Sequence, residues 1–414
     1  MNRLTRREFL SLSAATAAGL YLAGCQPLQA PAPEAPLATL PAPAPAEVNL
    51  LPADLQTTVE NVVAFMMDDS HTPGLAVGIV QDGEPIYAQS FGLATAGSDK
   101  PVTAQSLFQI MDMTHVFTAA AAMQLVEQGK LDLDAPVVEY LPYFQLDDER
   151  YKQITMRHLL TESAGLPEME YWNPAADWQG KTPQTDDGAL ERYVRNLGDV
   201  QLWQEPGQSP GFCNMTYDIA GDVIAKVSGE VFEEYMAHHV LQPLGMSQST
   251  FYPQQANPEL LVTPHMLDGV KAVPSELVTY SRERAPSVGL FSSLGNLLRW
   301  TQANLNRGEL DGQRILQAAT YDLLWAPFQV YSALYRSSDF DSKAIGWILG
   351  SLGSHPMYQY LGMDMGFNGA FCLVPERRSG AVVLSNLFSS FDTTSPFALS
   401  LAEMLLEMTA LKEA

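Results

Sequence analysis

Two ionisable residues one helical turn apart, Asp112 and His115, have the clearest potential for chemistry in this 414-residue sequence. A carboxylate beside an imidazole can act as a general base or as a nucleophile. The same pair can be purely structural, because an Asp in a first helical turn caps free N–H groups and a paired His is stabilised there. We favour the structural Asp112–His115 pair and keep the chemical role as an alternative.

An apolar helix must position this pair. Apolar residues recur at helical spacing after Asp112, and the segment Gln128-Gly129-Lys130 supplies a glycine cap with a cationic last turn. Because few charges interrupt the pattern, we expect the helix to be buried on most sides. The apolar positions are Val116, Ala119, Ala120, Met123 and Val126.

The segment 108–119 reads Phe-Gln-Ile-Met-Asp-Met-Thr-His-Val-Phe-Thr-Ala. It resembles the active-site helix of the penicillin-recognising serine hydrolases, which are class C β-lactamases, serine DD-peptidases and related esterases. In that family the frame is Phe-x-x-x-Ser-x-x-Lys-x-Phe-Thr, with Ser as nucleophile and Lys as base. Asp112 stands at the Ser position and His115 at the Lys position. The resemblance therefore implies the family scaffold without its usual chemistry.

Two further catalytic motifs of the family are also altered. After the turn at Pro206-Gly207, Phe212 stands at the position of a catalytic Tyr, while Asn214 is kept. In the third motif, Lys/His-x-Gly, Tyr360 replaces the cation and Gly362 is kept, which suits close backbone approach to a ligand. Asn214 either orients a ligand amide or bonds nearby backbone. Tyr360 is either a cross-strand packing residue, which we favour, or a phenolic acid–base group.

The resemblance extends over residues 51–414 and implies an α+β fold of the β-lactamase/transpeptidase type. We expect one domain, residues 53–414, with an antiparallel sheet built from both chain ends, flanking helices and a mostly helical part at about 112–280. The hydrophobic patterns predict helices and strands at its two ends. These are helices 55–67 and 397–411 and strands 74–80, 85–92, 370–374 and 380–386.

The first 52 residues predict export and anchoring. Thr5-Arg6-Arg7-Glu8-Phe9-Leu10 resembles a twin-arginine signal, and Leu22-Ala23-Gly24-Cys25 matches a lipobox in which Cys25 is lipidated. Residues 1–25 are thus the expected signal. Residues 26–52, rich in Pro and Ala, predict a semi-extended linker. We expect a lipoprotein anchored outside the cytoplasmic membrane, without a transmembrane helix.

The composition limits the partners. The formal net charge of -24 disfavours nucleic acid and anionic lipid headgroups. Three cysteines are too few for a disulfide framework. We expect Cys213 to be a buried, inert thiol, and both Cys213 and Cys372 can remain unpaired. A metal site at Asp112 and His115 would need a third ligand, and no ligand pair has recognisable metal spacing, so we expect no metal and no cofactor.

A Gly-x-Ser-x-Gly pattern and a set of methionines near the motifs each have a simpler explanation than a catalytic or binding role. Residues 207–211 fit the Gly-x-Ser-x-Gly elbow of α/β-hydrolases, but Pro210 has no N–H for an oxyanion, so we reject that reading. Methionines flank every motif, which is either ordinary core filling or a cleft adapted to a hydrophobic group. They are Met111, Met113, Met215, Met363 and Met365.

We therefore expect a catalytically inactive binding or accessory protein of the cell envelope, with a small-molecule or cell-wall ligand in its cleft. One alternative is a hydrolase of esters, amides or β-lactams that uses Asp112, His115 and Tyr360. Another is a structural interaction module with a filled cleft. An ordinary β-lactamase is disfavoured, because a fold does not establish an activity when the site residues differ.

Overall fold

A computed structural model of the chain describes residues 47–168, 183–275, 280–330, 342–388 and 397–410. The predicted signal with Cys25, and residues 26–46 of the predicted linker, lie outside this part. All the described residues fall within the unit Pro41–Ala414. No helix in the described ranges has both the length and the apolar character needed to cross a membrane.

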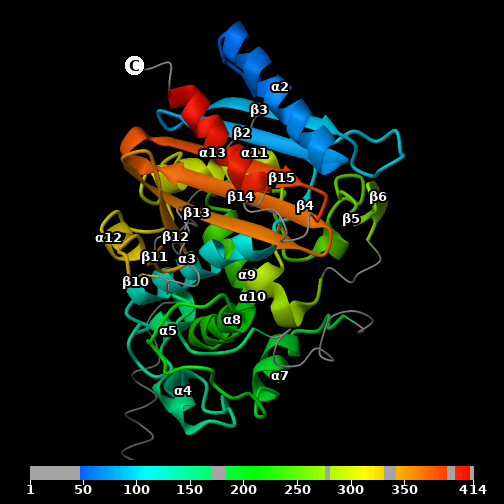
Figure 1. Cartoon of the computed structure of the whole chain (residues 1–414). Coiled ribbons are helices and arrows are strands. Elements are labelled where there is room, and N and C mark those ends of the chain that lie inside the picture. The colour runs from blue at the N-terminus through cyan, green and yellow to red at the C-terminus, as the bar shows by residue number, and fades with distance from the viewer. Residues whose placement is uncertain (1–46, 169–182, 276–279, 331–341, 389–396, 411–414) are drawn as a thin grey trace, which may run out of the picture. The chain divides into compact units, whose positions relative to one another are not determined.

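The centre of the fold is a nine-stranded antiparallel sheet that is built from both ends of the chain (Figure 1). Its strand order is β1-β3-β2-β15-β14-β13-β12-β11-β10, so the amino-terminal strand β2 pairs directly with the carboxy-terminal strand β15. The strands are β1 (Val48–Asn49), β2 (Gly74–Gln81), β3 (Glu84–Gly92), β10 (Gln329–Val330), β11 (Ser342–Lys343), β12 (Ile348–Leu352), β13 (His355–Asp364), β14 (Phe367–Val374) and β15 (Ser379–Ser385).

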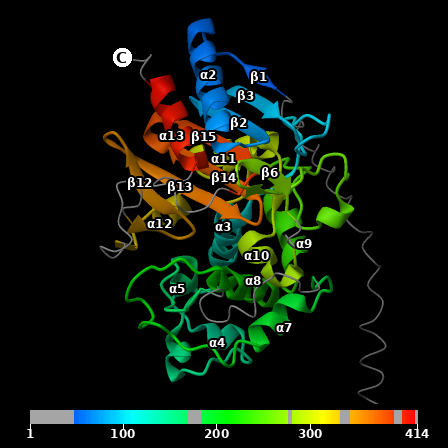
Figure 2. The same cartoon turned by 45° about the vertical axis from the view of Figure 1, so that its right-hand side comes forward.

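Alternating side chains divide the core between the two faces of the sheet. On β2, Leu75, Val77 and Ile79 pack in a cluster with α2 (Ala53–Ser70) and α13 (Phe397–Ala410). These two helices contact each other and lie together on one side of the sheet in both views (Figures 1 and 2). The apolar stripe of α2, formed by Leu55, Val59 and Val63, faces this cluster.

The opposite face carries the larger cluster. Helix α11 (Leu294–Leu305) packs on β2 and β15, and α3 (Thr114–Glu127) packs against α8 (Asn214–Ser228). The remaining helices of this part are α4 (Val137–Tyr140), α5 (Met156–Leu160), α7 (Ala189–Arg195), α9 (Phe232–Met236), α10 (Ala285–Val288) and α12 (Thr320–Leu324), with a π-helical turn at Ala237–Leu241. Short 3₁₀ turns lie at Met111–Met113 (η1), Glu149–Gln153, Pro253–Gln255, Arg282–Arg284 and Pro375–Arg377.

The described part of the chain also contains three short two-stranded sheets. They are β4 (Phe108–Gln109) with β7 (Phe291–Ser292), β5 (His265–Asp268) with β6 (Lys271–Pro274), and β8 (Glu309–Leu310) with β9 (Gln313–Arg314).

The predicted fold class and the six predicted helices and strands are confirmed. Their ends differ from the predicted ones by at most three residues, and two other expectations need correction. The end of the predicted linker, 26–52, belongs to the folded domain. Val48 and Asn49 form strand β1, which pairs with Ala88 and Tyr87 of β3. The helix expected from Asp112 begins as the 3₁₀ turn η1 and becomes α-helical at Thr114, with every residue from Thr114 to Leu125 buried.

Candidate functional site

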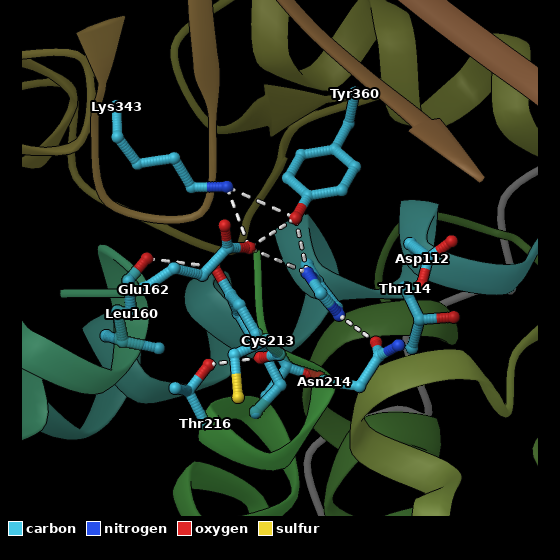
Figure 3. Close-up of polar contacts among 12 residues, drawn as sticks. Asp112, Thr114, Leu160, Glu162, Cys213, Asn214, Thr216, Lys343 and Tyr360 are labelled. Carbon is cyan, nitrogen blue, oxygen red and sulfur yellow. Dashed lines mark hydrogen bonds and ion pairs between the residues drawn. The ribbon is translucent and has the colours of Figure 1, made fainter. Parts of the chain in front are cut away.

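Asp112 lies in η1 at the start of α3, where the strand β13 passes close to it (Figure 3). Its side chain is 6% exposed, and its Oδ2 accepts a hydrogen bond of 3.2 Å from the backbone N–H of Met363. Burial, followed by the negative charge of Asp364, raises the pKa of Asp112 to about 7, although the Met363 bond opposes this shift.

Gly362 allows β13 to approach η1. A Cβ atom on Gly362 would lie 2.1 Å from the carbonyl oxygen of Ile110 and 3.0 Å from the backbone nitrogen of Asp112. No side chain fits there, so glycine is required by the packing of two backbone segments. The backbone that approaches Gly362 is that of η1, and the approach of a ligand, expected from the sequence, stays a prediction.

His115 is fully buried on α3, and both of its ring nitrogens have partners. Nε2 lies 3.0 Å from Oδ1 of Asn214, and Nδ1 is bonded to the hydroxyl of Tyr360 and lies 3.3 Å from Oε1 of Glu162. The ring also stacks on Tyr217, with centroids 3.7 Å apart. Burial lowers the pKa of His115, although the hydrogen bond and the negative charge of Glu162 oppose this shift.

Glu162 and Lys343 form a buried ion pair beside this histidine. The distance from Lys343 Nζ to Glu162 Oε1 is 2.8 Å, and the exposed fractions of the two side chains are 0% and 1%. The Tyr360 hydroxyl donates to the same Glu162 oxygen at 2.6 Å and accepts from Lys343 at 3.2 Å. Burial raises the pKa of Glu162, but the charge of Lys343 and the hydrogen bond from His115 outweigh it and lower the pKa to about 2. We call His115, Glu162, Lys343 and Tyr360 the ionic cluster.

The favoured Asp112–His115 pair is wrong. Within the described ranges, the hydrogen bonds of Asp112 come from backbone N–H groups and those of His115 go to the ionic cluster and Asn214. Asp112 does not cap α3 either, since that helix has no side-chain cap. The close approach of β13 instead places the backbone N–H of Met363 within hydrogen-bond distance of Asp112.

The other predicted positions lie around the same site. Phe212 is 51% exposed and stacks over His115 at a centroid distance of 6.3 Å. Asn214 starts α8 and bonds His115 through its side chain, which is neither of the two roles weighed for it. Tyr360 is more than a packing residue, because its hydroxyl lies at the centre of the ionic cluster (Figure 3).

Cys213, Cys372 and the five methionines that flank the motifs are buried. Cys213 and Cys372 are free thiols, and burial raises the pKa of both well above the ordinary value. Cys213 donates to the carbonyl of Pro167 at 3.2 Å, as fits an inert thiol. All five methionines that flank the motifs are less than a tenth exposed, which agrees with core filling.

Sequence reasoning missed Glu162 and Lys343. Each is a charged residue next to an apolar run, in Leu159-Leu160-Thr161-Glu162 and in Lys343-Ala344-Ile345. A charged residue beside an apolar run is rarely buried without a partner of opposite charge. The position of each charge next to an apolar run therefore indicated a buried ion pair. The pairing itself joins segments far apart in the chain, which no local pattern reveals.

The arrangement leaves little access and few ligands for a metal. His115 and Lys343 are 0% exposed and Asn214 is 7% exposed. In the part of the chain that the structure describes, no group of three His, Cys, Asp or Glu residues is placed to hold a metal ion. Asp112 and His115 accordingly have no third ligand there.

Comparisons with known proteins agree with this architecture. The sequence profile of the Beta-lactamase family matches residues 59–402. Penicillin-binding protein 4 of Amycolatopsis lactamdurans is 27% identical over 77% of this chain and 82% of its own length. Protein flp of Staphylococcus aureus strain MW2 is 23% identical over 82% of this chain, which spans only 64% of that protein.

Two solved structures share the fold. An octameric penicillin-binding protein homologue from Pyrococcus abyssi has a TM-score of 0.73 and 24% identity, over 86% of this chain and 77% of that one. EstCE1, a hydrolase with promiscuous acyltransferase activity, has a TM-score of 0.72 and 22% identity, over 85% and 98%. The family profile extends over most of the described sheet and helices, and the chain therefore belongs to the Beta-lactamase family.

Proposed function

We propose that this chain is a non-catalytic member of the family, a binding or accessory protein of the cell envelope. The engagement of His115 carries the proposal. Both ring nitrogens bond residues other than Asp112, so the residue at the base position is not hydrogen-bonded to the residue at the nucleophile position, as a base that activates it would be.

The residue at the nucleophile position, Asp112, also supports a non-catalytic role. The Asp112 carboxylate is held by backbone N–H groups, and an acyl group transferred to it would form a mixed anhydride, which water hydrolyses rapidly. The phenol expected at position 212 is replaced by Phe, which cannot relay a proton. The scaffold for ligand binding is kept while the groups for acyl transfer are absent.

The ligand class we propose is a cell-wall peptide or a related small molecule. A relative is named as a penicillin-binding protein, and Phe212 offers an exposed aromatic ring over the site. We also propose that the chain is exported and anchored through a lipid on Cys25, on the strength of the motifs in residues 1–25, and that it binds no nucleic acid, given its net charge of -24.

A hydrolase is the second candidate, and one observation favours it. Burial raises the pKa of Asp112 to about 7, a value suited to a general base at neutral pH. In that case Asp112 would activate water directly, without help from His115.

One experiment separates the two candidates. The purified protein and its Asp112→Ala variant are incubated with a chromogenic cephalosporin, p-nitrophenyl esters and a D-Ala-D-Ala peptide, and covalent adducts are measured by intact mass. We expect no turnover and no adduct in either protein. Turnover by the wild type that disappears in Asp112→Ala would overturn the proposal and establish the hydrolase.

Binding is tested separately. Calorimetry with the D-Ala-D-Ala peptide compares the wild type with Phe212→Ala, which removes the exposed ring, and Phe65→Ala, which removes another exposed ring from α2. We expect weaker binding only in the Phe212 variant. Equal affinity in all three would count against this ligand class at this site.

A further inference from the structure

His265 is a buried histidine outside the candidate site, and both of its ring nitrogens bond backbone groups. It is 0% exposed and begins β5. Its Nδ1 lies 2.9 Å from the carbonyl oxygen of Asn386, just after β15, and its Nε2 accepts from the backbone N–H of Ala96 at 3.0 Å. Ala96 belongs to the loop 93–101, which follows β3. The ring therefore joins three segments that are far apart in the sequence.

The polarity of these partners allows a single form of the ring. A carbonyl oxygen can only accept, so Nδ1 must carry a proton, and a backbone N–H can only donate, so Nε2 must be bare. A second proton on Nε2 would point at the N–H of Ala96, break that hydrogen bond and bring two donors together. Burial also lowers the pKa of His265, although the hydrogen bond to Asn386 opposes this shift. The contacts therefore require the neutral ring.

The same loop is also held by bonds that do not titrate. The side-chain amide of Asn386 donates to the carbonyls of Leu93 and Ala94, at 3.1 Å each. The backbone N–H of Thr263 donates to the carbonyl of Ala94 at 2.9 Å. Of these loop contacts in the described part of the chain, the bond to His265 is the one that a proton breaks.

His265 also lies against the turn between β13 and β14. Its backbone N–H donates to the carbonyl of Gly366 at 3.1 Å, and a Cβ atom on Gly366 would lie 2.5 Å from the Cβ of Pro264. Strand β13 carries Met363, whose N–H bonds Asp112 in the candidate site. A change at His265 can therefore reach the site through this turn.

No charged residue in the described ranges bonds the His265 ring. The charged residues on the elements packed against it are Asp99, Lys100, Asp268, Lys271 and Asp364. Within those ranges, the ring bonds backbone groups and no charge shifts its pKa. Protonation of His265 is thus governed by its burial and by its backbone bonds.

We propose that His265, Ala96 and Asn386 form a pH-sensitive latch, which holds the β5–β6 hairpin to the loop 93–101 while the ring is neutral and releases it when the ring is protonated. The released hairpin is the element that supports the β13–β14 turn beside the candidate site. The inference goes beyond the proposed function, because it holds for a binding site and for a catalytic site alike.

The latch should weaken as the pH falls. A released His265 has the ordinary pKa of about 6.5, and the held ring has a lower one. Between these two values the released form binds more protons than the held form, so the free energy of opening decreases as the pH falls below about 6.5. One proton corresponds to about a tenfold change in the opening equilibrium for each pH unit.

Hydrogen–deuterium exchange of the full chain measures the opening. Peptides from 93–101 and 263–275 are followed by mass spectrometry at pH 7.5 and pH 5.5, with rates corrected for the intrinsic effect of pH on exchange. We expect the protection of both segments to fall about tenfold at pH 5.5 in the wild type. Helix α11, which contains no histidine, is the internal reference and should keep its protection.

His265→Gln is the decisive variant. Its amide oxygen can accept from Ala96 without titrating, so the two segments should be equally protected at both pH values. Asp112, whose pKa is raised to about 7, is unchanged in this variant. His355→Gln is the matched control, since this partly exposed histidine on β13 bonds Glu376, and it should keep the wild-type pH dependence. Equal protection of the wild-type segments at both pH values, or a loss that persists in His265→Gln, would overturn the proposal.

NMR of the wild-type ring tests the same latch should the glutamine variant not fold. The ¹⁵N chemical shifts of the His265 ring report which nitrogen carries the proton. We expect a proton on Nδ1 alone at pH 7.5 and a protonation midpoint below about 6.5. A proton on Nε2 at pH 7.5, or a midpoint above that value, would contradict the latch. Failure of the proposed function would instead appear as substrate turnover, which neither measurement detects.

Discussion

Two buried ion pairs in this molecule have opposite surroundings. The ionic cluster joins Glu162 to Lys343 with no exposed member. The second pair joins Arg282 to Glu233 by hydrogen bonds of 2.6 and 3.1 Å, and Arg282 also bonds Asp187, which is 78% exposed. A cavity of about 300 Å³ adjoins this second pair. One pair is sealed, and the other borders space that water can enter.

The two pairs should differ in how much stability the protein loses when one partner of the pair is removed. A buried charge that loses its partner is costly where nothing can replace that partner, whereas water can take up part of the charge at a hydrated edge. The Arg282 pair can therefore be read as structural reinforcement of the helical part. The ionic cluster fixes His115 and Tyr360 in one arrangement, which is the condition that keeps the site inactive in our proposal.

Loss of the cation in the sealed pair should have the largest effect. Lys343→Met leaves Glu162 charged and buried, and we expect the free energy of unfolding to fall by about 4 kcal/mol. Urea unfolding followed by circular dichroism measures it. The double variant Lys343→Met/Glu162→Gln should recover most of the loss, because the unpaired charge is gone. Strictly additive losses would contradict a coupled, sealed pair.

The same substitution type at the open pair should cost less. Arg282→Met leaves Glu233 beside the cavity, and we expect a loss of roughly 2 kcal/mol in the same urea experiment. If this loss equals or exceeds that of Lys343→Met, the contrast between a sealed and a hydrated pair is wrong.

Disturbing the packing beside the sealed region should have a similar or smaller effect. Gly362→Ala forces β13 away from the carbonyl of Ile110, and we expect a loss of about 1–3 kcal/mol. Gly211→Ala is the matched control, since its added Cβ atom meets nothing within 4 Å. Equal stability of the two variants would show that the close approach of β13 to η1 is not tight.

Thiol chemistry gives the smallest but most direct test of sealing. Cys213 lies just before α8 under the site, and Cys372 lies on β14, and both are buried. In the native protein, iodoacetamide should modify neither within hours, and both should react in 6 M guanidinium chloride. Peptide mapping by mass spectrometry measures each site. Rapid native modification of Cys213 alone would show that the site opens.

The scaffold was predictable and the network was not, for physical reasons. Gly362 and the apolar helix after Asp112 leave local signals in spacing and residue type. The partners of His115 come from three other parts of the fold: the loop after α5, the start of α8, and β13. Whether Asp112 bonds His115 or the backbone N–H of Met363 depends on the position of β13 beside η1, and sequence patterns do not carry that information.

The pairing of β2 with β15 has a consequence for how the protein is made. Val80 pairs with Gly380 and Leu75 with Ser385, so strands from the two ends of the domain are neighbours in one sheet. During synthesis, β2 and β3 leave the ribosome long before their neighbour exists. Contacts of such large sequence separation form slowly, because a long loop must close first. The sheet can be completed only after translation of β15, so the amino-terminal hairpin must wait with an unpaired edge that is open to chaperones and to aggregation.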